Sequence, residues 1–145
     1  MRPSARAEIL GRSAPRDLAR LGSDRLTFAG ERPDTRPHWA SVSVAVVPLL
    51  AGGGTRLKIL EAAACGVPVV STPIGAEGLD LVPEREVRLR EDPAGFADAV
   101  AELLADPEAS RRQAIAARAR VEALYDWKRI GEEFARALAG ARGRA

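Results

Sequence analysis

Two short apolar segments, separated by a glycine loop and an apolar helix, constrain the fold of this chain most. Residues 43–49 (SVAVVPL) form a nearly continuous β-branched run, which is typical of a strand buried on both faces. After the glycines of 51–54 (AGGG), residues 55–65 predict a helix that ends at Gly66. Residues 68–72 (PVVST) predict a second buried strand. This order predicts two parallel strands covered by helices.

The rest of the chain continues the alternation of strands and helices. Asp92 and Asp106 each precede a proline, which predicts an N-cap followed by a first-turn proline. We therefore expect one Rossmann-like α/β domain over residues 1–139, with helices on both faces of a parallel sheet, and a flexible tail at 140–145. The further expected strands are 5–10, 25–29 and 86–90, and the further expected helices are 15–21, 93–105, 107–124 and 126–139.

Composition excludes several classes of protein. The 145 residues carry a net charge of +2 with basic and acidic residues intermixed, so we expect no nucleic-acid partner. The sequence has neither a run of eighteen apolar residues nor the apolar core of a secretory signal, which predicts no transmembrane segment. The single cysteine, Cys65, is expected as a small core residue, and a cytoplasmic location fits. We expect no metal and no other cofactor.

The glycine loop lies where parallel sheets bind ligands, directly after the carboxyl end of a buried strand. A dinucleotide-binding loop needs a third glycine where Leu57 stands, and a Walker loop needs Gly-Lys-Ser/Thr at the helix start, so both are rejected. What remains is their shared chemistry, because small residues such as Gly53 and Gly54 leave N–H groups and a helix dipole free to meet an anion.

Three charged side chains at the start of the helix sharpen this expectation. Arg56 and Lys58 stand in the first turn, where a cation costs the helix about 0.3–1 kcal/mol unless an anion offsets it. That placement indicates a phosphate group. Glu61 follows Lys58 by three residues, so the pair could form a surface salt bridge, or Glu61 could bind ribose hydroxyls. The residues alone leave these two alternatives open.

The segment PLLAGGGTRLKILEAAACGVPVVSTPIGAEGL, at 48–79, resembles the donor-binding half of retaining GT-B glycosyltransferases of the family-4, group 1 type. The likeness extends over about 5–138. It implies a hexosyltransferase-type enzyme whose donor is a nucleotide-diphospho-sugar, with transfer to an acceptor hydroxyl and retention at the sugar.

The resemblance also implies roles for particular residues. Glu61 matches the glutamate that binds the ribose, and Leu57 and Lys58 match the positions whose backbone amides meet the diphosphate. Many members carry a second glutamate near the transferred sugar, where this chain has Gly53. The expected donor-binding set is Gly53, Gly54, Thr55, Arg56, Leu57, Lys58 and Glu61, with Gly30 and Gly75 as weaker candidates.

The family has a second, acceptor-binding domain that this sequence lacks, so the chain is expected to be the C-terminal half, catalytically incomplete alone. A separate acceptor-binding domain or chain is the expected partner beside the nucleotide-sugar. Two alternatives are a non-catalytic nucleotide-sugar-binding module and a truncated remnant that depends on a partner chain. Glu77, after Gly75, is expected as a solvated loop acid, and Tyr125 and Trp127 are expected to anchor the last helix.

Overall fold

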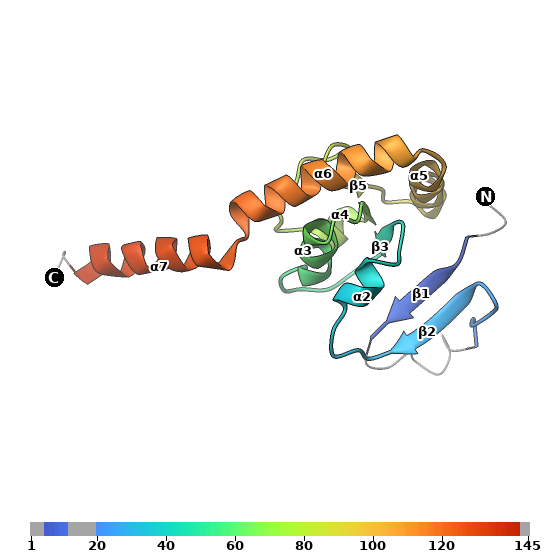
Figure 1. Cartoon of the computed structure of the whole chain (residues 1–145), viewed down its shortest axis with the longest axis horizontal. Helices are drawn as coiled ribbons and strands as arrows, with labels where there is room; N and C mark the ends of the chain where they lie inside the picture. Colours follow the sequence, from blue (N-terminus) through green and yellow to red (C-terminus); the bar gives the residue numbers. More distant parts are fainter. Residues whose placement is uncertain (1–4, 12–19, 143–145) are drawn as a thin grey trace. The chain divides into compact units, whose positions relative to one another are not determined.

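The computed structural model describes residues 5–11 and 20–142, which fall in two compact units, Met1–His38 and Trp39–Ala145 (Figure 1). The described strands form two parallel sheets, one of two strands and one of three. The single domain expected over residues 1–139 therefore stays a prediction. Most of the helix expected at 15–21 lies outside the described residues.

The first unit contains a pair of parallel strands. Strand β1 spans Ala7–Leu10 and β2 spans Leu26–Gly30, which confirms two expected strands to within two residues at each end. The short helix α2, Arg36–Trp39, follows β2, and the boundary between the two units falls within it.

The second unit contains the strands that flank the glycine loop. Strands β3 (Ala45–Val47), β4 (Val69–Ser71) and β5 (Arg88–Leu89) lie in the order β3-β4-β5, all parallel. Each is shorter than the segment predicted for it, at 43–49, 68–72 and 86–90. Because the strands are parallel and consecutive, the loops after β3 and β4 leave the same edge of the sheet side by side.

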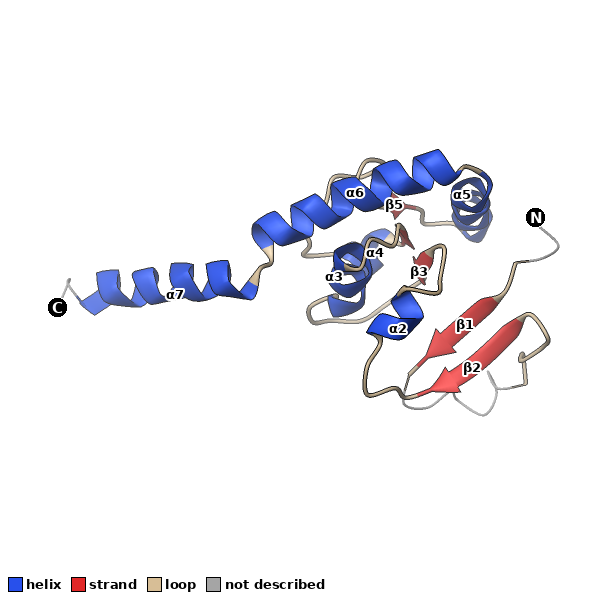
Figure 2. Cartoon of the chain, viewed as in Figure 1, coloured by secondary structure: helices blue, strands red, loops and turns tan. Residues whose placement is uncertain are grey.

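Five helices complete this unit (Figure 2). Two of them have the predicted bounds, and a short one, α4, lies in a segment expected to be a loop. The helices are α3 (Leu57–Ala64), α4 (Pro73–Ala76), α5 (Pro93–Ala105), α6 (Pro107–Leu124) and α7 (Trp127–Arg142).

Helices cover both faces of the three-stranded sheet, as predicted. On one face the buried side chains of Val47 and Val69 pack in one cluster with those of α3 and α6. On the other face Val70 packs against Ala99 and Leu103 of α5. The strand predicted at 43–49, which is β3, was expected to be buried on both faces. This expectation is wrong at Val46, which is 48% exposed. Its side chain points to the second face, where α5 covers the neighbouring strand and leaves Val46 open.

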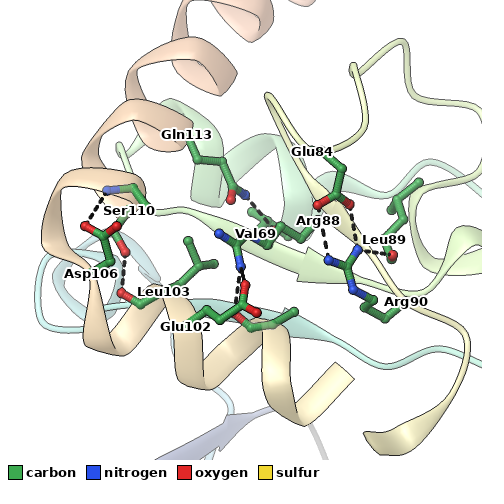
Figure 3. A network of polar contacts seen from close by, with 12 residues as sticks. Val69, Glu84, Arg88, Leu89, Arg90, Glu102, Leu103, Asp106, Ser110 and Gln113 are labelled. Carbon is green, nitrogen blue, oxygen red and sulfur yellow. Dashed lines mark hydrogen bonds and ion pairs between the residues drawn. The ribbon is translucent and has the colours of Figure 1, made fainter. Parts of the chain in front are cut away.

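Polar contacts fasten α5 and α6 to the sheet (Figure 3). The Gln113 side chain on α6 donates to the Val69 carbonyl at 2.7 Å, and Arg88 of β5 pairs with Glu102 of α5. Directly after β5, Nη1 and Nη2 of Arg90 both donate to the Glu84 carboxylate. These hydrogen bonds hold the pKa of Glu84 below its ordinary value.

Asp106 caps α6, and its charge contributes to stability in a way that pH can test. The carboxylate accepts from the Glu108 and Ala109 N–H groups, both at 3.0 Å, and chiefly the Ala109 bond lowers its pKa below 3.8. A lowered folded-state pKa gives stability that is present above pH 3.8 and lost as the pH falls through the folded value. Asp106→Asn keeps a capping oxygen but does not titrate. We expect wild type to lose more stability than Asp106→Asn between pH 5 and about pH 2 in urea unfolding. Equal losses would show that the cap charge adds nothing.

Three expectations in this unit need correction. Cys65 is exposed, because α3 ends one residue earlier and the chain turns away at Gly66, where φ is +74°. Trp127 is 81% exposed and does not belong to the core of the described residues, whereas the Tyr125 hydroxyl accepts from the Asp80 N–H group at 2.7 Å and its ring packs on the core. Helix α7 continues to Arg142, beyond its predicted end at 139, and the flexible tail expected at 140–145 stays a prediction.

Candidate functional site

The loop after β3 takes a conformation that only glycine adopts readily. Gly52 has φ +141° and Gly54 has φ +82°, both in the region that strains residues with a Cβ atom. Gly53 lies between them with no atom within 4 Å of its ideal Cβ position. The glycines therefore turn the chain sharply and leave its backbone open above the start of α3.

Several backbone N–H groups at this turn are unused. Within the described part of the chain, those of Gly53, Gly54, Thr55 and Lys58 donate no hydrogen bond, and all four residues are exposed. The Leu57 N–H group, by contrast, donates to the Thr55 carbonyl at 3.0 Å. The turn therefore presents donors, with the positive end of the α3 dipole behind them.

Arg56 does not take the position expected of a phosphate-binding side chain. It is 5% exposed, and its guanidinium group is directed into the loop. Nη1 donates to the Gly53 carbonyl at 2.9 Å, and Nη2 donates to the carbonyls of Gly52, at 2.9 Å, and Ile74, at 3.0 Å. The planar, five-donor guanidinium bonds three carbonyls from two segments at once. Arg56 thus ties the glycine loop to α4, and its place among the donor-binding residues stays a prediction.

Lys58 and Glu61 lie on the exposed side of α3. No hydrogen bond or ion pair joins Lys58 to Glu61 or to any other residue that the structure describes. The surface salt bridge that the sequence left open is therefore not formed. Lys58 adds a cation beside the unused N–H groups, and Glu61 lies one turn further along the helix.

Helix α4 follows β4 and was not predicted, although its signal is in the sequence. Thr72 precedes Pro73, and its hydroxyl accepts from the Gly75 N–H group at 2.9 Å as an N-cap. The same hydroxyl donates to the Leu49 carbonyl. Thr72 therefore joins the ends of β3 and β4, directly beside the glycine loop.

The two weaker candidates lie in different settings. Gly75 is buried, its N–H group is already bonded, and an added Cβ would lie 2.4 Å from the Ser71 hydroxyl. Gly75 thus allows α4 to pack closely on β4. Gly30 ends β2 in the first unit, with φ +70°, and its part in a donor site stays a prediction.

The comparisons with known proteins bear on this arrangement. The family model "Glycosyl transferases group 1" matches residues 1–106. The chain belongs to this family. The predicted fold, a Rossmann-like α/β domain of the GT-B type, is confirmed by the solved structures that share it.

Relatives of this chain include named sugar transferases. A glycogen synthase of Mycobacterium tuberculosis is 40% identical over 91 residues, which are 60% of this chain and 22% of the relative. A GDP-mannose-dependent monoacylated alpha-(1-6)-phosphatidylinositol monomannoside mannosyltransferase of Corynebacterium glutamicum is 30% identical over 94% of this chain and 39% of its own length. The chain thus spans well under half of these curated relatives.

A solved structure shares the fold at lower identity. HepE from Anabaena, solved in complex with UDP-glucose, has a TM-score of 0.83 and 23% identity, over 95% of this chain and 42% of that chain. In the described parts of this chain, no helix is long and apolar enough to cross a membrane. The same residues form no group of three or more His, Cys, Asp or Glu side chains placed to hold a metal ion.

Proposed function

We propose that this chain binds the nucleoside-diphosphate part of a nucleotide-sugar at the glycine loop and the start of α3. The observation that carries the proposal is the set of unused N–H groups at Gly53, Gly54, Thr55 and Lys58, together with the exposed Lys58 side chain. Such groups at a helix start bind phosphate oxygens, since the donors converge and the helix dipole favours negative charge. Lys58 adds a flexible positive charge at the same place.

Glu61 is the residue we assign to the ribose. It lies one helical turn beyond Lys58, so phosphates at the loop would place the sugar of the nucleotide over Glu61. A carboxylate accepts two hydroxyl hydrogen bonds, as acidic residues do in other nucleotide-binding folds.

The reaction that this binding serves is glycosyl transfer to an acceptor hydroxyl with retention at the sugar. Charge develops on the departing diphosphate, and the N–H groups and Lys58 would stabilise it without a metal ion. A separate domain or chain would bind the acceptor. The sugar transferases among the curated relatives and the UDP-glucose complex of HepE support this class of donor.

Thermal unfolding against UDP, GDP, ADP and their glucose or mannose esters tests the proposal. A ligand at a hundred times its Kd adds about 2.7 kcal/mol of stability, which is a measurable shift in Tm. We expect one nucleotide family to stabilise the wild type and to lose most of this effect in Glu61→Ala, because the ribose loses its acceptor.

Glu122→Ala is the matched control. Glu122 also carries an exposed carboxylate on a helix, paired with Arg118 four residues earlier. The Glu122→Ala variant should show the same nucleotide-induced shift in Tm as the wild type. If no nucleotide stabilises the wild type, or if both variants respond alike, the proposed donor site is wrong.

A further inference from the structure

We propose that the Glu77 carboxylate binds hydroxyl groups of the transferred sugar and that Arg56 positions it. This proposal rests on the proposed donor site and deepens it, because it assigns a residue to the sugar moiety. Glu77 was expected to be a solvated loop acid. The structure gives it a defined neighbour at the glycine loop.

The position of Glu77 follows from the sheet. Helix α4 begins directly after β4, and Glu77 is the residue at its C-cap. The glycine loop leaves the adjacent parallel strand β3 at the same edge. Glu77 therefore lies at the edge where α/β sheets bind ligands, one strand away from the proposed phosphate site.

Arg56 connects the two loops. Its Nη2 atom, which donates to the carbonyls of Gly52 and Ile74, lies 4.0 Å from the Glu77 Oε2 atom. The guanidinium is almost fully buried, whereas the Glu77 side chain is 74% exposed. The pair therefore extends from the interior to the surface. The Arg56 cation is held in the interior by its carbonyl partners, and the Glu77 carboxylate is exposed to solvent.

The carboxylate is available for a ligand. It makes no hydrogen bond with any of the residues in the described ranges, and its contact with Arg56 is longer than a hydrogen bond. Both oxygens can accept hydrogen bonds. Arg56 also offsets the repulsion between this carboxylate and a nearby diphosphate, and that offset lets an acid sit so close to a phosphate site.

The glycine loop offers donors but few acceptors, and this favours a sugar as the partner of Glu77. Its residues from 51 to 54 have no polar side chain, and the carbonyls of Gly52 and Gly53 are occupied by Arg56. A hexose presents several hydroxyl groups that need acceptors, and hydrogen bonds to an ionised carboxylate are about twice as strong as neutral ones. Glu77 supplies the acceptor that the loop lacks.

The test compares two affinities in one variant. We would titrate wild type and Glu77→Gln calorimetrically with UDP, GDP and ADP, and with UDP-glucose, GDP-mannose and ADP-glucose. For the nucleotide that binds, we expect Glu77→Gln to weaken the sugar ester about tenfold or more while the free diphosphate stays within about twofold. Glu122→Gln is the control and should change neither affinity.

The outcomes separate this proposal from its alternatives. If Glu77→Gln lowers only the stability, or weakens both ligands equally, Glu77 serves to balance the Arg56 charge and the proposal is overturned. The same holds if neither affinity changes. If no nucleotide or nucleotide-sugar binds the wild type, the donor site itself is wrong, and the assignment of Glu77 falls with it.

Discussion

Gly75→Ala is expected to destabilise the chain by about 3 kcal/mol, because the added methyl group has no space. An ideal Cβ at this position lies 2.4 Å from the Ser71 Oγ atom, 2.8 Å from the Val47 carbonyl oxygen and 3.0 Å from the Thr72 Oγ1 atom. The Ser71 and Val47 atoms belong to the buried strands β4 and β3, which cannot shift easily. Helix α4 must therefore move away from the sheet. Urea unfolding should show the loss as a lower midpoint with an unchanged slope.

A double-mutant cycle with Ser71→Ala tests the cause. Ser71→Ala removes the nearest clashing atom, so the double variant should be more stable than the sum of the two single effects predicts. The Val47 carbonyl still obstructs the methyl group, and the rescue should therefore be incomplete. Gly131→Ala, where no atom lies within 4 Å, should cost nothing or stabilise α7 by up to about 1 kcal/mol. A Gly75→Ala variant as stable as wild type would contradict the close packing of α4.

The secondary structure of the second unit could be predicted wherever local chemistry decides it. Asp106 and Pro107 fix the start of α6, and the predicted bounds of α5 and α6 agree with the structure residue for residue. Strand ends were less predictable, because the apolar run at 43–49 continues past the three residues that pair with β4. Exposure on the second face, as at Val46, depends on which helix lies over it, and no local pattern contains that information.

In the candidate site too, features that depend on neighbouring residues could be predicted, and contacts between distant segments could not. The glycine loop and Glu61 could be found from sequence because they form one continuous motif. The contacts of Arg56 could not be predicted from this motif, since its guanidinium bonds the Ile74 carbonyl, eighteen residues away. Thr72 followed by Pro73 carries the same capping signal as the two Asp-Pro pairs, with a hydroxyl in place of the carboxylate, and it would have predicted α4.

Arg56→Met is expected to impair both folding and nucleotide binding. Methionine retains much of the side-chain volume but leaves three carbonyl oxygens without their donor, one of them on α4. We expect a loss of about 2–3 kcal/mol in urea unfolding, as for hydrogen bonds to a buried charged group. The glycine loop would then lose its fixed conformation, so its N–H groups would no longer converge, and nucleotide affinity should fall at least tenfold.

Lys58→Met separates this positioning role from direct contact with phosphate. Lys58 is exposed and makes no ion pair with the described residues, so its loss should change stability by less than about 0.5 kcal/mol. It should still weaken nucleotide binding, and affinity should depend less on salt than in wild type, because one screened charge is gone. Arg56→Met should keep most of the wild-type salt dependence, since the cation that faces solvent remains. If instead Arg56→Met unfolds at the wild-type midpoint and loses the salt dependence, Arg56 contacts the phosphates itself and the sequence-based assignment was right.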